Sequence, residues 1–311
     1  MILTVTLNPA IDRTISVDRL AFEDRAYINS TGESPGGRGI NAACVIHSFE
    51  GSTLAVITSG GAVGARMEEL LRCCGYPVVI VPIQKETRTN LTITDRQGLT
   101  VNLNETGPRM EKAEIARLEK VVREKLEGAA WLMLAGSLPP GVPPSFYARL
   151  IATARERKVK TLLDADGDAL REGIEAGPTV VSPNQQEAER LLSRALLTRG
   201  HFVEAVKRIR QMGAENVVLS LGSRGAMGAF GNRLVEAVPP RIDAVSPIGS
   251  GDALAAAFVW AMERKNDPVD AMRWGVATGT ASTLLPGLRF ASRQQAEEMY
   301  QRVEVKKVVP A

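Results

Sequence analysis

The sequence predicts an α/β fold. A mostly parallel sheet is expected between two layers of helices, as a three-layer α/β/α core with a small antiparallel β sheet attached. From about residue 110 onward, short apolar segments alternate with segments of helical periodicity, which is typical of parallel sheets covered on both faces. By contrast, the early segments 91–93 and 99–103 alternate strictly between apolar and polar residues, which is typical of strands with one solvated face.

The elements of the core follow one another along the rest of the chain. Apolar residues recur at helical spacing between 114 and 126, so this segment is predicted to be an amphipathic helix. Further strands are expected at 130–134, 161–163, 179–181 and 217–219, and further helices around 146–151 and over 203–212. Ligands of such folds bind beyond the carboxyl ends of the strands, where the Gly-rich and Asn-rich segments of this chain fall.

The small sheet is predicted from the early segments. Residues 95–98, Asp-Arg-Gln-Gly, form a turn that joins 91–93 to 99–103 in a hairpin. Segments 11–17 and 27–31 alternate less clearly and are expected to join it. The alternative is that these pieces are edge strands of the main sheet. We therefore expect a single domain over 1–311, with a β lid contributed by about 10–34 and 87–106.

Composition favours a cytoplasmic location and argues against some classes of partner. Its 38 basic and 35 acidic residues give a net charge of +3, which is too balanced to favour a nucleic-acid partner. Neither a signal peptide nor an apolar run of roughly 20 residues is evident, so no membrane partner is expected. Three cysteines, two of them adjacent, suit neither a disulfide framework nor a metal site. Because there are only two histidines, carboxylates are the first candidates for acid–base chemistry.

The turn Gly249-Ser250-Gly251-Asp252 carries the strongest chemical signal. An Ala-rich helix is predicted to begin at once, and successive backbone N–H groups at a helix N-terminus form an anion site. Asp252 lies in the first turn, where it could accept a proton from an attacking hydroxyl. The alternative is a small-residue turn in which Asp252 stabilises the helix dipole. No P-loop motif occurs in the chain.

Three further segments each allow two interpretations. Residues 34–43 place glycines around Arg38 and Asn41, as a ligand site or as a turn before a helix. In 182–187, Asn184 and Glu187 have the spacing of a capping box, which is the alternative to a functional site after a strand. Residues 220–226 suit either a hairpin turn or a nucleotide contact.

The order of the motifs is more specific than any one of them. They are Asn-Pro-Ala-Ile-Asp (8–12), Gly-Gly-Arg-Gly-Ile-Asn (36–41), Thr-Arg-Thr-Asn (87–90), Gly-Ser-Leu-Pro-Pro-Gly (136–141), Pro-Asn-Gln-Gln-Glu (183–187), Ser-Leu-Gly-Ser-Arg-Gly-Ala (220–226) and Gly-Ser-Gly-Asp (249–252). In this order the chain resembles the ribokinase-like carbohydrate kinases over nearly its whole length. Within them it is most similar to the phosphofructokinase B branch, whose members phosphorylate sugar phosphates.

The resemblance implies a role for each motif residue. Asp252 would be the catalytic base, and the amides of Gly249, Ser250 and Gly251 would form the anion hole. The sugar site would contain Asp12, Gly37, Arg38 and Asn41, with Arg88 and Ser137 at the phosphate of the substrate. The nucleotide would contact Asn184, Ser220, Gly222 and Gly225, and Glu187 would lie near Mg²⁺, through water. Two positions depart from the branch, which usually has lysine where Arg38 and Ser182 stand.

The expected activity is transfer of the γ-phosphate of Mg-ATP to a ketohexose monophosphate, either fructose 1-phosphate, fructose 6-phosphate or tagatose 6-phosphate. The resemblance favours a phosphorylated acceptor because Arg38 and Arg88 are expected to converge on an anion. One alternative is a kinase for an unphosphorylated sugar or nucleoside, and another is a catalytically silent sensor of sugar or nucleotide. A monovalent cation is a further candidate cofactor. The amphipathic lid predicts a homodimer, since its second apolar face needs cover.

Overall fold

The structure is a computed structural model that describes residues 1–21, 24–265 and 267–308. Its main sheet contains, in chain order, β1 (Ile2–Thr6), β4 (Thr53–Ser59), β5 (Val78–Pro82), β8 (Trp131–Ala135), β9 (Lys160–Asp164), β10 (Val180–Val181), β11 (Asn216–Ser220), β12 (Ala226–Phe230), β13 (Arg233–Val238) and β14 (Glu304–Lys307). They lie in the order β14-β13-β12-β11-β10-β9-β8-β1-β4-β5. The pairs from β11 to β5 are parallel, whereas β12, β13 and β14 add to the edge as antiparallel strands.

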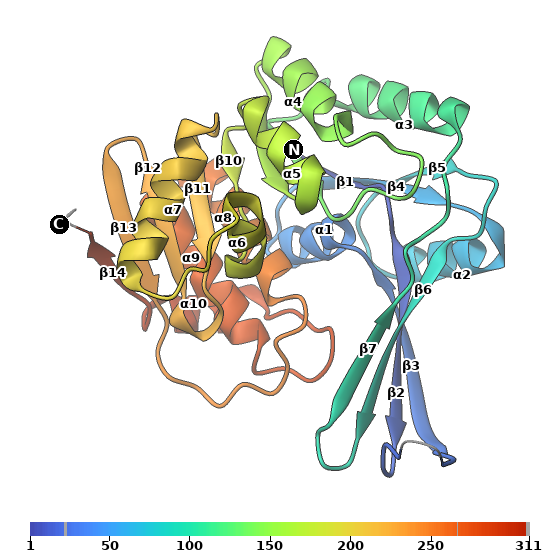
Figure 1. Cartoon of the computed structure of the whole chain (residues 1–311). Helices are drawn as coiled ribbons and strands as arrows, with labels where there is room; N and C mark the ends of the chain where they lie inside the picture. The colour runs from blue at the N-terminus through green and yellow to red at the C-terminus, as the bar shows by residue number, and fades with distance from the viewer. Residues whose placement is uncertain (22–23, 266, 309–311) are drawn as a thin grey trace.

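Helices cover both faces of this sheet, as Figure 1 shows. Successive residues of β8 illustrate the two sides: Leu132 and Leu134 pack into one hydrophobic cluster, and Trp131 and Met133 pack into another. The first cluster takes in α3 (Lys112–Lys125), α4 (Phe146–Glu156), α5 (Gly167–Glu175), α6 (Gln185–Leu192) and α7 (Arg199–Gln211). The opposite face is covered by α1 (Arg38–Ser48), α2 (Gly61–Arg72), α8 (Ser250–Lys265), α9 (Pro268–Ser282) and α10 (Arg293–Tyr300). The predicted three-layer, mostly parallel core is therefore confirmed.

A second sheet projects from the core and forms the predicted lid (Figure 1). Its order is β3-β2-β6-β7, built from β2 (Ala10–Val17), β3 (Ile28–Gly36), β6 (Arg88–Asp95) and β7 (Thr100–Asn104). The strands thus form a separate sheet, so the alternative of edge strands on the main sheet is wrong. Residues 22–23 of the expected range 10–34 lie outside the described residues.

The centre of the lid differs from a purely antiparallel arrangement. β2–β3 and β6–β7 are antiparallel, but β2 pairs with β6 in parallel. The physical reason is the connection: β3, α1, β4, α2 and β5 intervene between these strands, and such a long crossover permits parallel pairing. In the part of the chain that the structure describes, no helix is both long and apolar enough to span a membrane.

Candidate active site

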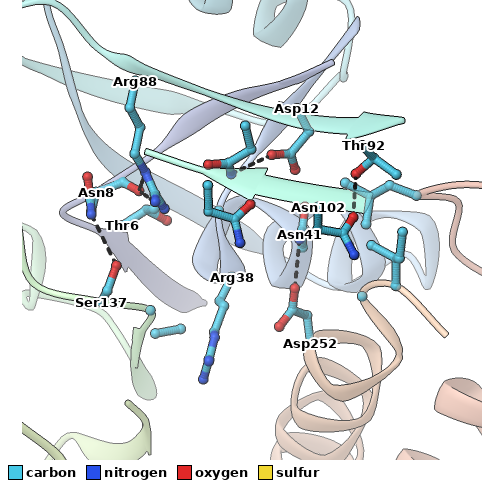
Figure 2. A pocket seen from close by; sticks show the side chains of 18 of the residues that line it. Thr6, Asn8, Asp12, Arg38, Asn41, Arg88, Thr92, Asn102, Ser137 and Asp252 are labelled. Carbon is cyan, nitrogen blue, oxygen red and sulfur yellow. Dashed lines mark hydrogen bonds between the residues drawn. The ribbon is translucent and has the colours of Figure 1, made fainter. Parts of the chain in front are cut away.

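A pocket of about 470 Å³ lies under the lid, and we call it the lid pocket. Figure 2 shows that its walls come from the lid strands, from α1 and from the start of α8. The residues that line it are Thr6, Asn8, Asp12, Thr14, Gly37, Arg38, Asn41, Arg88, Asn90, Thr92, Asn102, Asn104, Ala135, Gly136, Ser137, Ile248, Gly249, Asp252 and Leu288. Amide, hydroxyl and charged side chains dominate this set, which suits a small ligand with many hydroxyl groups.

The register of the lid strands places one polar face over this pocket. Asp12 pairs with Asn90, which in turn pairs with Asn104. Two residues further along, Thr14, Thr92 and Asn102 form a second row. Because side chains alternate between faces, the intervening apolar residues point away from the pocket; these are Ile15, Leu91, Ile93, Val101 and Leu103.

Asp12 is held at the edge of the lid pocket. Asn90 Nδ2 donates a hydrogen bond of 2.8 Å to Asp12 Oδ1. A Cβ atom on Gly36 would lie 2.1 Å from Asp12 Oδ2, so the carboxylate needs glycine at that position. Burial raises the pKa of Asp12, and the hydrogen bond from Asn90 and the charge of Arg88 oppose that rise.

Asp252 lies on the opposite side of the pocket, in the first turn of α8. Asn41 Nδ2 from α1 donates to Asp252 Oδ2 at 2.7 Å (Figure 2). Burial raises the pKa of this carboxyl, whereas Arg38 and Asn41 lower it. A half-buried carboxylate with a raised pKa, facing a pocket, has the properties of a general base.

A second cavity of about 910 Å³, the core pocket, lies on the other side of the same turn. Its lining includes four of the residues expected at the nucleotide, namely Asn184, Ser220, Gly222 and Gly225. Ser250 and Gly251 line the core pocket, whereas Gly249 and Asp252 line the lid pocket. The 249–252 turn is therefore a wall shared by the two cavities.

The segments after β10 and β11 form a helix cap and a hairpin turn, and residues of both line the core pocket. Asn184 Oδ1 accepts from Glu187 N, and Glu187 Oε2 accepts from Asn184 N, both at 2.9 Å. The expected capping box is therefore confirmed. Residues 222–224 form a short 3₁₀ helix, η1 (Gly222–Arg224), between the antiparallel strands β11 and β12, so the hairpin turn is confirmed too.

Glu187 is also joined to Arg38. Arg38 Nη2 donates to Glu187 Oε1 at 2.9 Å, and Nη1 donates to Asp164 Oδ1 at 2.6 Å. The carboxyl pKa of each acid is raised by burial and lowered by the Arg38 charge. Asp164 ends β9, so the guanidinium group reaches from the lid pocket to the carboxyl edge of the main sheet.

Arg88 and Ser137 lie at the far end of the lid pocket from Asp252 (Figure 2). Arg88 donates to the backbone oxygens of Asn8 and Glu105, while Ser137 Oγ accepts from Asn8 Nδ2 at 3.1 Å. Arg38 and Arg88 both line the lid pocket, and in Figure 2 the Arg38 side chain extends away from Arg88. The Arg38 guanidinium group is bound to Asp164 and Glu187, and the convergence of the pair on an anion stays a prediction.

Several pocket residues were not singled out from the sequence. Asn8 and Asn90 were quoted only as motif letters, yet both line the lid pocket, as does Thr6. Asn8 Oδ1, Asn90 Oδ1 and Thr6 Oγ1 are buried and have no hydrogen-bond partner among the described residues. Such atoms are expected to find a partner in a ligand or water. Asn102 and Asn104 could have been found from their spacing of two on the polar face of the hairpin.

Comparison with known proteins identifies the family of the chain. The model of the pfkB family of carbohydrate kinases matches residues 5–295. The chain belongs to this family. The fold comparison is consistent: the structure of phosphofructokinase-2 from Escherichia coli in complex with potassium superposes with a TM-score of 0.90, at 31% identity over 96% of this chain and 98% of that one.

Relatives in the pfkB family act on different sugar phosphates. The chain is 32% identical to ATP-dependent 6-phosphofructokinase isozyme 2 of E. coli, over 96% of this chain and 97% of the relative. It is 28% identical to 1-phosphofructokinase of Vibrio cholerae, over 99% and 98% respectively. Tagatose-6-phosphate kinase of Staphylococcus epidermidis is 26% identical, over 98% and 99%. The prediction of a pfkB-type kinase is therefore confirmed.

Proposed function

We propose that the chain transfers the γ-phosphate of ATP to a hydroxyl of a ketohexose monophosphate, with Asp252 as the base. The observation that carries this proposal is the shared wall: the 249–252 turn lies between a polar pocket and a larger cavity. A phosphoryl group that passes from a ligand in one pocket to a ligand in the other would be transferred beside this turn. The names of the relatives support the same class of reaction, because they are a 6-phosphofructokinase, a 1-phosphofructokinase and a tagatose-6-phosphate kinase.

In this proposal each side of the turn has one task. Asp252 accepts the proton of the attacking hydroxyl in the lid pocket, where Asp12 and Asn90 orient the sugar. The first backbone amides of a helix have no intrahelical partners, so in this proposal those of Gly249, Ser250 and Gly251, around the start of α8, stabilise the charge on the transferring group. Ser250 N donates to Pro247 O at 3.3 Å in the structure and would exchange this bond for a phosphate oxygen. Phosphoryl transfer depends mainly on such positioning and charge stabilisation.

The far end of the lid pocket suits the phosphate that the acceptor already carries. Arg88 uses Nε, Nη1 and Nη2 on the carbonyls of Asn8 and Glu105. A guanidinium group has five N–H donors, so further donors remain for a phosphate. Ser137 and Asn8 lie beside it with polar atoms of their own. The acceptor phosphate would thus lie opposite Asp252 in the pocket.

The core pocket would hold ATP, with its phosphates toward Ser250 and Gly251. Mg²⁺ fits the chemistry of the residues present, because it is usually bound by one or two carboxylates together with substrate phosphates. Glu187 is the carboxylate expected to hold it, through water. Bound Mg²⁺ would neutralise charge on the ATP phosphates. The potassium complex of the E. coli neighbour supports a monovalent cation as well.

The lid would pair with the lid of a second copy. Its outward face carries exposed apolar side chains, among them Leu103 (51% exposed) and Ile28 (59%). A neighbouring structure is described as a tetrameric inhibited form of E. coli phosphofructokinase-2, which supports self-association. The proposal is a homodimer through these faces.

A panel of acceptors tests the proposed substrate class. ADP release would be measured with fructose 1-phosphate, fructose 6-phosphate, tagatose 6-phosphate, free fructose and ribose. We expect kcat/KM for at least one ketohexose phosphate to exceed that for every neutral sugar. A preference for free fructose or ribose would contradict the proposal, and so would turnover with none of the five.

A further inference from the structure

Arg38 binds two buried carboxylates at once. Its Nη1 and Nη2 atoms reach Asp164 at 2.6 Å and Glu187 at 2.9 Å. Asp164 is 7% exposed and Glu187 is 2% exposed. These acids come from separate elements, the end of β9 and the first turn of α6. One guanidinium group therefore serves as the shared counter-ion of a carboxylate pair.

The pair has the charge of a cation site. Both carboxylates are buried, and the Arg38 guanidinium group is the cation that both of them contact. Their charges in turn raise the pKa of Arg38, with that of Asp164 as the largest cause. Without Arg38, two carboxylates of like charge would share one buried location. Such a location attracts another cation.

Glu187 would keep its position without Arg38. Its second oxygen, Oε2, accepts from Asn184 N at 2.9 Å in the capping box. The helix cap thus fixes the carboxylate, while Arg38 occupies the oxygen that faces Asp164. The helix cap therefore holds the Glu187 carboxylate in place, and Arg38 neutralises its charge.

We propose that Arg38 occupies, in the nucleotide-free protein, the place between Asp164 and Glu187 that a divalent cation would otherwise take. Arg38 would then exclude the free cation and release the carboxylates only when a nucleotide offers its phosphates. Phosphate oxygens are alternative partners for a guanidinium fork, so Arg38 exchanges carboxylate partners for a phosphate. Arg38 is thereby a positioning residue that makes cation binding depend on nucleotide binding. The inference rests on the proposed function only in placing the nucleotide phosphates near Glu187.

Binding of Mn²⁺ alone tests the exclusion. Free Mn²⁺ would be titrated by electron paramagnetic resonance against the whole protein, with neither nucleotide nor sugar present. We expect Arg38→Gln to raise Mn²⁺ affinity by about tenfold or more, because one charge-assisted competitor is removed. Arg38→Lys supplies one compact charge for two acids, so its Mn²⁺ affinity is expected to lie between that of Arg38→Gln and that of the wild type.

Arg190→Gln is the matched control. Arg190 lies on α6, as Glu187 does, and it pairs with Asp166 at the surface. Arg190→Gln removes one positive charge nearby, as Arg38→Gln does, but it frees neither buried carboxylate. The Mn²⁺ affinity of this variant should therefore stay within about twofold of the wild type. A comparable rise in this variant would overturn the inference, since the effect would then be general electrostatics.

Two further results are decisive. Unchanged or weaker Mn²⁺ binding by a folded Arg38→Gln protein would show that Arg38 organises the acids rather than excluding the cation. If circular dichroism shows that Arg38→Gln does not fold, the comparison passes to Arg38→Lys, where an unchanged affinity overturns the inference. Because the titration involves no turnover, its outcome is independent of the acceptor panel.

Discussion

Asp252 combines two properties that a catalytic base needs. It faces the lid pocket, and its pKa is raised chiefly by burial. Asn41 holds one carboxylate oxygen at 2.7 Å, which leaves the other for an incoming hydroxyl. A base with a raised pKa accepts a proton more readily once it is ionised.

The raised pKa predicts the acid side of the pH–rate profile. In the proposed mechanism Asp252 acts in its ionised form, and burial disfavours that form, so a higher pH is needed to ionise it. We expect kcat/KM to fall as pH drops through a pKa above 3.8, the ordinary value of an Asp carboxyl. Steady-state rates from pH 3.5 to 8, with circular dichroism at each pH to exclude unfolding, would measure it. An acid limb at or below pH 3.8 in folded protein would contradict the prediction.

A substitution at Gly251 tests the proposed anion hole with little expected effect on folding. A Cβ atom at this position would meet no protein atom within 4 Å, and Gly251 lines the core pocket. We expect Gly251→Ala to place its methyl group where the transferring phosphate lies. The expected loss in kcat is about 10²–10³-fold, similar to the loss of one oxyanion-hole donor.

Gly200→Ala is the control for Gly251→Ala. Gly200 is likewise the second residue of a helix, α7, and its added Cβ would make an ordinary contact of 3.7 Å. Both changes should preserve or slightly raise the melting temperature, because alanine favours a helix over glycine. Wild-type kcat in a folded Gly251→Ala protein would contradict the assignment of the anion hole.

The lid sheet has one polar face and one apolar face. Its strand register brings Asp12, Asn90 and Asn104 into one row above the pocket, while the residues between them point outward. A slip of one residue would reverse the faces. The same periodicity that gives the lid pocket its polar surface therefore leaves apolar side chains on the outward face of the lid.

Changing the outward face should separate the two copies. Leu103, at 51% exposure, lies on this face opposite Leu91, and Leu103→Asp would place a charge in the proposed interface. We expect light scattering at micromolar concentration to give twice the chain mass of 33.4 kDa for the wild type and one chain mass for Leu103→Asp. Leu197→Asp is the control, because Leu197 is 75% exposed between α6 and α7. A monomeric wild type would contradict the proposed dimer.

For the molecule as a whole, local sequence signals located many of the elements, and the site residues predicted from the ordered motifs include eight of the 19 residues that line the lid pocket. Helical periodicity and alternation located the core elements and the hairpin, and the glycine-rich turns marked the pocket walls. Long-range pairing was beyond such signals. Asp12 and Asn90, which meet across the parallel pair β2–β6, are 78 residues apart, and the antiparallel edge formed by β12 to β14 was likewise not predicted.

Arg38 shows why part of the site could not be predicted. Its glycine-rich surroundings indicated a ligand site, but its partners Asp164 and Glu187 lie 126 and 149 residues away in the sequence. Only the order of the strands in the sheet brings the three together. A local motif can thus identify a charged side chain without showing which charge it will meet.

Replacing the base tests the proposed mechanism most directly. Asp252→Asn would be compared with Asp168→Asn, since Asp168 is an exposed acid in the first turn of α5, as Asp252 is in that of α8. Turnover would be measured with the best sugar phosphate of the panel, and binding of that sugar phosphate by calorimetry. We expect Asp252→Asn to lose about 10²–10⁴-fold in kcat, the usual contribution of a general base, while its affinity for the sugar phosphate and all properties of Asp168→Asn stay near wild type. Wild-type turnover by Asp252→Asn would contradict the mechanism.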